Sequence, residues 1–133
     1  MPCSFEFEWK HRIIRCRLYG EVTDGDLKEL YTTGYKLVFR TQPVASITDG
    51  SESTSFAVSP QMIRQLATAA PVLPNPAFCR VIIAPSPIMY GMARMFEMLG
   101  ESTRPNLYIV RTEAEALALL KVKTVRFEPL DRE

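Results

Sequence analysis

Polar side chains that could do chemistry follow several of the predicted strands. Asp49, Ser51 and Ser53 come after one predicted strand. Ser86 follows the next strand along the chain, and Arg111 ends the one after that. In an open α/β sheet, ligands and regulatory groups gather where parallel strands end. These strand ends are therefore the first place at which the sequence indicates a functional site, and we expect Asp49, Ser51 and Ser53 to form a regulatory loop.

The sequence offers little for enzyme chemistry. Its single histidine, His11, lies among charged neighbours in a predicted hairpin turn, whereas a catalytic histidine needs a cleft and a nucleophile beside it. There is no His-Glu-x-x-His or Cys-x-x-Cys pattern for zinc, and no Gly-x-Ser-x-Gly elbow. The glycines of 20–25 are spaced as in a phosphate loop, but Asp26-Leu27 replaces the required Lys-Ser/Thr. We predict no catalytic residue, no metal and no cofactor.

A methionine-rich helix is expected at residues 86–99. Its methionines recur every three residues, a row that drifts around a helix, so that not all of them can face the core. The expected inner stripe is Ile88, Met92, Met95, Phe96 and Leu99. Methionine adapts its shape easily, which suits a partner groove or an apolar ligand. The candidate partner or ligand surface is Ser86, Tyr90, Arg94 and Met98, and the candidate apolar pocket is Met92, Met95 and Phe96.

The bulk properties are typical of one ordinary globular domain. The 133 residues carry a net charge of +1, so no long-range field favours nucleic acid or an anionic membrane. No apolar run approaches the roughly 20 residues that a transmembrane helix needs. The three cysteines form no close pair, which favours reduced thiols and a cytoplasmic location. We expect a single domain at residues 1–121 and a C-terminal tail or short edge strand at residues 122–133.

The periodicity of apolar residues indicates an α/β fold. Strands are expected at 5–9, 12–19, 44–48, 79–84 and 107–111. Helices are expected at 23–40, from Ser59-Pro60 to about 70, at 86–99, and from the capping box of Thr112 and Glu115 to Leu120. Residues 52–59 are polar and are expected to form a loop. The predicted order is β-β-α-β-α-β-α-β-α, a mixed sheet with an opening hairpin followed by parallel strands.

This order resembles the STAS superfamily, whose bacterial members include anti-sigma-factor antagonists, and within it small stand-alone STAS/SEC14-like proteins. The likeness covers residues 5–121 and is most specific at Ala84-Pro85-Ser86, at Tyr90–Phe96 and at the helix that opens at Thr112. In the antagonists a phosphorylatable serine follows the third strand, and the partial match here is Asp49 and Ser51. The SEC14-like relatives imply instead an apolar ligand held between helices and sheet.

Two functions are therefore expected from different classes. The first is a non-enzymatic cytoplasmic regulatory module of STAS type that binds a protein partner. The alternative is a carrier of a lipid or another small apolar ligand. An enzyme of unknown class is a third possibility, because scattered carboxylates are present, and a homodimer is compatible with each of the three.

Overall fold

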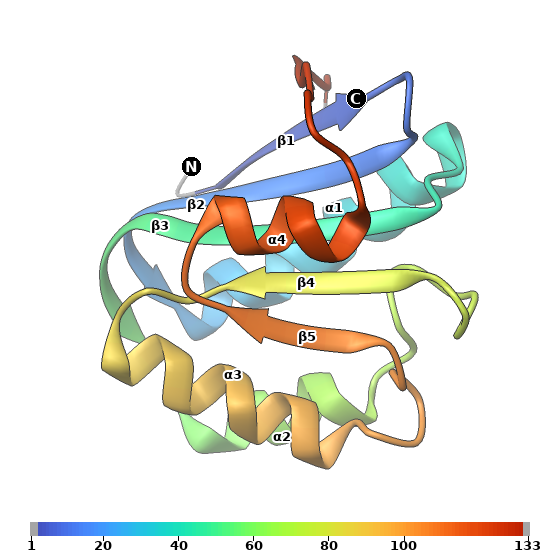
Figure 1. Cartoon of the computed structure of the whole chain (residues 1–133). Coiled ribbons are helices and arrows are strands. Elements are labelled where there is room, and N and C mark those ends of the chain that lie inside the picture. Colours follow the sequence, from blue (N-terminus) through green and yellow to red (C-terminus); the bar gives the residue numbers. More distant parts are fainter. Residues whose placement is uncertain (1–2, 132–133) are drawn as a thin grey trace.

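In the computed structural model, which describes residues 3–131, the chain forms one six-stranded sheet (Figure 1). The strand order is β5-β4-β3-β2-β1-β6. Strands β2 to β5 are parallel, and β1 is antiparallel to both of its neighbours, β2 and β6. The strand bounds are β1 Cys3–Glu8, β2 Ile13–Thr23, β3 Ala45–Ala57, β4 Cys79–Ile83, β5 Leu107–Val110 and β6 Glu128–Pro129.

Each of the four helices begins at a side-chain cap that can be recognised in the sequence. The hydroxyls of Thr23, Ser59, Ser86 and Thr112 accept a hydrogen bond from the backbone N–H three residues ahead, which satisfies one of the free N–H groups of the first turn. The helix bounds are α1 Asp24–Thr41, α2 Pro60–Thr68, α3 Pro87–Leu99 and α4 Glu113–Leu120. The expected mixed α/β fold and its order of elements are confirmed, and β6 follows at the end.

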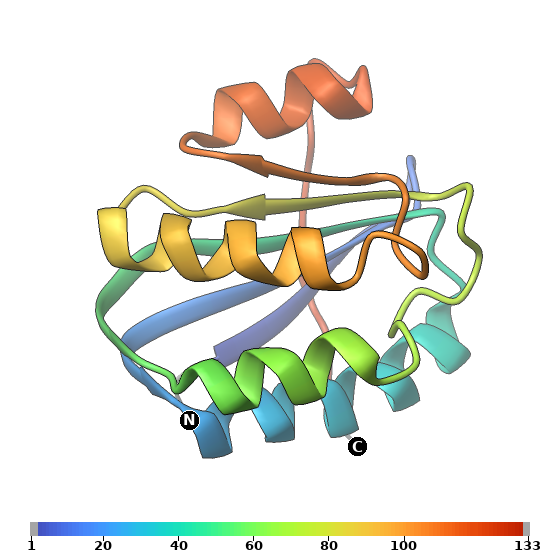
Figure 2. The same cartoon turned by 90° about the horizontal axis from the view of Figure 1, so that it is seen from below.

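The helices cover the two faces of the sheet unequally. Helices α1, α2 and α3 lie on one face, and α4 alone lies on the other (Figure 2). The larger core fills the space between the sheet and the three helices, with Phe5, Leu18 and Leu37 among its buried members. A smaller core beneath α4 contains Ile47 and Ala116. Ala45 and Ile47 of β3 both belong to this smaller core, two residues apart, as the pleat of a strand requires.

Strand β3 is much longer than the predicted 44–48, and the expected loop at 52–59 is wrong. After Asp49 the strand continues beside the second half of β2, and the register shifts twice, between Arg17 and Tyr19 and between Gly20 and Glu21. These irregularities let the polar second halves of β2 and β3 stay paired. Phe56 is the apolar anchor of this extension, and it lies opposite the buried Val22 of β2.

The C-terminal segment returns to the sheet rather than trailing away from it. The Leu130 N–H donates to the Phe5 carbonyl at 2.9 Å, and β6 pairs with β1. The Arg15 guanidinium stacks 3.9 Å from the centroid of the Phe127 ring. Of the predicted division into 1–121 and 122–133, residues 1, 2, 132 and 133 lie outside the described residues. Within residues 3–131, none of the helices has the length and apolar character needed to cross a membrane.

Candidate functional site

Helix α3 buries a different stripe from the expected one. Met89 and Phe96 face the core, whereas Ile88 is 66% exposed and Leu99 is 50% exposed. The prediction that Ile88 and Leu99 lie inside is therefore wrong. The reason lies across the interface at Gly50, where a Cβ would come within 2.2 Å of the Met89 sulfur. The absent side chain leaves room for Met89 to enter the core.

A second apolar row lies on the flank of α3, beside its buried stripe. Ile88, Met92, Met95 and Leu99 are spaced by four, three and four residues, which places them on one side of the helix. The middle pair is half-buried and the two ends are exposed. We call these four residues the outer row. Helix α3 therefore has one apolar stripe that is buried in the core and a second, the outer row, that is partly exposed.

The four residues predicted as a partner surface all lie on α3 or at its start. Ser86 is exposed, but its hydroxyl is the N-cap of the helix. Tyr90 is half-buried, with the Arg111 guanidinium 4.3 Å from its ring centroid. Arg94 pairs with Glu97 at 3.1 Å.

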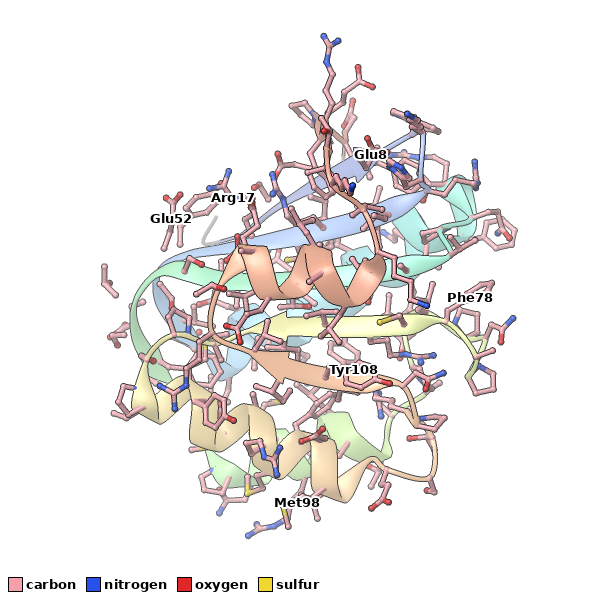
Figure 3. All side chains as sticks on the ribbon, in the orientation of Figure 1. Glu8, Arg17, Glu52, Phe78, Met98 and Tyr108 are labelled. Atoms are coloured by element: carbon pink, nitrogen blue, oxygen red, sulfur yellow. The ribbon has the colours of Figure 1, made fainter. Side chains whose placement is uncertain are left out.

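Met98 is 67% exposed, and its side chain points away from the sheet (Figure 3). Tyr90, Arg94 and Met98 follow one another at intervals of four residues, so they form a row on the helix. At 3.6 residues per turn this polar and aromatic row lies roughly 130° around the helix from the outer row, so the two rows occupy different flanks of α3.

The predicted regulatory residues lie within β3 and not in a free loop. Asp49 is buried, and its Oδ1 accepts a hydrogen bond of 2.9 Å from the Ser51 N–H. The Ser53 hydroxyl donates to the Gly50 carbonyl at 2.7 Å. Ser51 itself is exposed. Because α2 begins only at Pro60, Ser51 is in a strand and does not stand at a helix N-terminus.

Ser51 lies beside an ion pair that joins β2 to β3. The Arg17 guanidinium bonds the Glu52 carboxylate at 2.5 Å and lies 4.0 Å from Glu6 (Figure 3). Arg17 is also the register partner of Asp49. The surface around Ser51 therefore already holds acidic groups balanced by one arginine.

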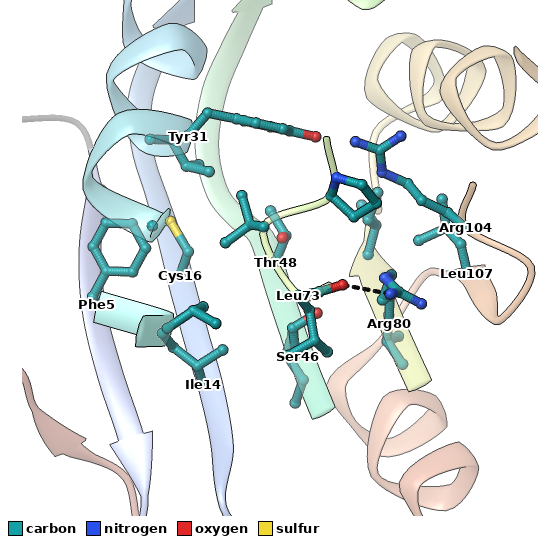
Figure 4. Close-up of a pocket in the computed structure, with 18 of the residues that line it drawn as sticks. Phe5, Ile14, Cys16, Tyr31, Ser46, Thr48, Leu73, Arg80, Arg104 and Leu107 are labelled. Atoms are coloured by element: carbon teal, nitrogen blue, oxygen red, sulfur yellow. Dashed lines mark hydrogen bonds between the residues drawn. The ribbon is translucent and has the colours of Figure 1, made fainter. Parts of the chain in front are cut away.

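A cavity of about 100 Å³ lies between the sheet and α1, bordered by the segment that follows α2 (Figure 4). Most of its wall is apolar. Two arginines also line it, Arg80 on β4 and Arg104 before β5, and the structure buries both almost completely. Sequence reasoning did not single them out. Arg80 had a signal, since it is the one charged residue within the apolar run 79–84.

A second cavity of about 100 Å³ adjoins the first beneath α2 and α3. The two share Tyr31, Thr48 and Phe96 in their walls, among others. Met92 and Phe96 of the predicted apolar pocket line the second cavity. Met95 does not line either of them and packs against the rim of the core.

Metal-binding groups do not converge in the part of the chain that the structure describes. There, no three or more His, Cys, Asp or Glu side chains are arranged to hold a metal ion. His11 lies in the turn between β1 and β2, with its Nδ1 3.2 Å from the Glu8 carboxylate. Glu8 in turn accepts the backbone N–H of Arg126, so this cluster ties chain segments together.

The arrangement of sheet and helices defines a STAS-type fold, and comparison with solved structures shows the same. The chain superimposes on the unphosphorylated anti-sigma factor antagonist SpoIIAA with a TM-score of 0.59 and 17% identity, covering 90% of this chain and 97% of that one. For the phosphorylated form of SpoIIAA, a Bacillus cell fate determinant, the TM-score is 0.55 and the identity 19%, covering 88% of this chain and 99% of that one. No protein-family model matches the sequence, and no curated protein does. At these identities the likeness establishes the fold, and confirms the predicted STAS-like topology.

Proposed function

We propose that this chain is a non-enzymatic, cytoplasmic regulatory module that binds a protein partner through the exposed side of α3. The observation that carries the proposal is the outer row, whose ends Ile88 and Leu99 are exposed although the helix already has a complete buried stripe. Apolar side chains gathered on one surface mark interaction sites more often than isolated ones do. Methionines in the middle of the row can adapt to a partner's shape.

The row on the other flank of α3 also supports a partner surface on this helix. Tyr90 provides aromatic area and Arg94 a charge, residue types that are enriched at the centres of interfaces. Met98 adds an exposed apolar side chain. The predicted residues Ser86, Tyr90, Arg94 and Met98 thus remain our candidates for contact with the partner, together with the outer row.

Ser51 is our candidate for a switch on this module. The solved SpoIIAA structures include a phosphorylated and an unphosphorylated form, which makes modification of this chain worth testing. A phosphate on Ser51 would add about −1.5 to −2 charges. Asp49 and Glu52 already place negative charge beside it, and Arg17 is the nearby cation. We propose that the added repulsion lowers affinity for the partner.

The test is co-purification of partners from the source cells with charged variants of α3. Ile88→Glu and Leu99→Glu place a carboxylate on the outer row at exposed positions, so folding should survive. Losing the burial of one such side chain costs about 1.5–3 kcal/mol, which predicts at least a roughly tenfold loss of bound partner. Leu119→Glu is the matched control, since Leu119 is 39% exposed on α4, across the sheet. Equal recovery with all three variants would contradict the proposal.

A second candidate function, the carrier of a small ligand, is supported by the two adjoining cavities. They lie between sheet and helices, where the predicted Met92 and Phe96 are found. Native mass spectrometry of gently purified protein would reveal a ligand as extra mass that disappears on denaturation. A bare polypeptide mass would count against this candidate and leave the protein-binding proposal untouched.

A homodimer remains a proposal as well. Strand β5 forms one edge of the sheet, and Tyr108 on it is exposed (Figure 3). An unpaired strand edge can add a strand from a second copy. Light scattering over a dilution series would show a mass that falls from twice the chain mass if this pairing forms, and a constant single-chain mass if it does not.

A further inference from the structure

We propose that the two adjoining cavities bind a small amphipathic carboxylate, with its carboxylate at Arg80 and Arg104 and its apolar part beneath α2 and α3. The inference rests on the carrier role, the second candidate above, and gives that role a ligand class. It does not depend on the partner surface of α3.

The first argument is charge. Arg80 is 5% exposed and Arg104 is 4% exposed, and among residues 3–131 neither forms an ion pair with a carboxylate. Burial of a charge is costly unless an opposite charge compensates it. Two guanidiniums on one cavity without a counter-ion therefore leave an uncompensated positive site inside the protein.

Backbone carbonyls account for most of the hydrogen bonds of these arginines, but not for their charge. Arg104 donates to the carbonyls of Leu66 and Ala67 at the end of α2, at 3.1 and 3.0 Å. Arg80 donates to the carbonyls of Leu73, Asn75 and Phe78, at 2.5 to 2.8 Å (Figure 4). Carbonyl dipoles stabilise a cation but do not neutralise it.

One donor on this cavity has no partner within the described part of the chain. The Arg80 Nε is fully buried and forms no hydrogen bond there. A buried donor left unpaired costs about 1–3 kcal/mol, so a shift of the guanidinium that lets Nε bond an acceptor in the cavity would recover that free energy. A carboxylate offers two oxygens and matches the planar guanidinium geometry.

Further polar groups surround the same position. Ser46 and Thr48 of β3 line the cavity, and each carries a hydroxyl group. Tyr31 reaches in from α1 with its hydroxyl directed toward Arg104 (Figure 4). Burial, and next the charge of Arg104, lowers the pKa of Arg80, and burial raises the pKa of Tyr31. The shift at Arg80 fits a site in which an anion would relieve repulsion between the two arginines.

The second cavity defines the other end of the ligand. Its wall is almost entirely apolar, with Leu27, Ile63 and Met89 among the lining residues. Each cavity measures about 100 Å³, whereas an apolar cavity of roughly 150 Å³ binds benzene. Together they fit a medium-length alkyl chain or a single ring attached to the carboxylate, and they are too small for a phospholipid.

The experiment is calorimetric titration of the full chain with octanoate, 1-octanol, n-octyl phosphate and inorganic phosphate. We expect octanoate to bind about tenfold or more tightly than octanol, since a hydrogen bond to a charged group contributes about 1.5–3 kcal/mol. Equal affinity for octanoate and octanol would overturn the role of the arginines but keep a carrier. Binding by neither would overturn the inference and the carrier role together.

The two phosphate compounds test which anionic group the site prefers. Tighter binding of octyl phosphate than of octanoate would overturn the assignment to a carboxylate. If inorganic phosphate bound as tightly as octanoate or octyl phosphate, the site would be one for a free ion, and the proposal would also be overturned.

Variants test separately the location of the apolar part and the role of the guanidinium. Ala93→Leu fills the apolar cavity from α3 and should abolish octanoate binding. Arg80→Lys keeps the charge but loses the planar fork, and should weaken octanoate while leaving octanol unchanged. Gly91→Ala is the control, because a Cβ there meets nothing within 4 Å. Undiminished octanoate binding by Ala93→Leu would contradict the proposed location.

Discussion

The sulfur of Met89 occupies the space that a side chain at residue 50 would need. A Cβ built on Gly50 would lie 2.2 Å from that sulfur and 3.0 Å from the Ile83 carbonyl oxygen. The close approach lets α3 rest on the sheet with Met89 buried. It also determines which residues of α3 turn outward, so Gly50 is linked to the proposed partner surface although it lies in β3.

Substitution of Gly50 by alanine should destabilise the protein by about 1–3 kcal/mol, because the flexible Met89 side chain can give way but the Ile83 backbone carbonyl, 3.0 Å from the new Cβ, cannot. Urea denaturation measures the change. The control is Gly91→Ala within α3, where there is open space around the glycine and alanine should stabilise the helix by about 1 kcal/mol. Similar effects of the two substitutions would contradict the steric account.

Ser59→Ala should cost about 1–2 kcal/mol, because the serine performs two functions at once. Its hydroxyl caps α2 through the Met62 N–H at 3.1 Å and donates to the Asp24 carboxylate at 2.8 Å. Asp24 stands at the start of α1, so the pair connects two helices. Thermal denaturation of Ser59→Ala and of the control Ser55→Ala, at an exposed position in β3, tests this prediction. A loss no greater than that of Ser55→Ala would refute it.

The stability of the hairpin should depend on pH through Glu8. Burial acts to raise the pKa of Glu8, but hydrogen bonds from the backbone of His11 and Arg126 outweigh it and hold the pKa below its ordinary value of 4.5. Since the pKa is lower in the folded than in the unfolded chain, this stabilisation is present above pH 4.5 and is lost as the pH falls through the folded-state pKa.

The free energy of unfolding of the parent protein should therefore fall on acidification below pH 4.5, and that of Glu8→Gln should fall less. Urea titrations at neutral pH and at several acidic values make the comparison. An identical pH dependence for parent and variant would show that Glu8 contributes nothing to it.

Ser51→Asp should weaken partner binding if Ser51 acts as a switch. The new carboxylate would lie beside Asp49 and Glu52, and only part of the charge of a phosphate would be reproduced. We expect a several-fold loss of partner in co-purification, with the fold retained because Ser51 is exposed. Thr54→Asp, at another exposed position in the same strand, is the control. A loss equal for both would indicate a general charge effect and not a specific switch.

Much of the fold follows from local patterns. Caps such as Ser86 and Thr112, and the alternation in the opening hairpin, are signals that a few neighbouring residues carry by themselves. Residues 50–57 lacked such a signal, since their strand depends on pairing with β2, a partner distant in sequence, and on Phe56 alone for apolar anchorage. Local pattern could not reveal that pairing.

The candidate site was predictable only in part for a similar reason. The period of α3 was read correctly, but two adjacent stripes were both apolar, and the choice between them depended on Gly50 across the interface. The cavity arginines, Arg80 and Arg104, come from segments far apart in sequence. Their convergence is a property of the tertiary structure.

The most direct test of the central claim is photo-crosslinking in the source cells. A photoreactive p-benzoylphenylalanine is placed at Leu99 in the outer row or, as the control, at Leu119 on α4. We predict a discrete crosslinked protein from position 99 that is absent from position 119 and that disappears when Ile88→Glu is added. The same crosslinks from both positions, or none from position 99, would contradict a partner surface on α3.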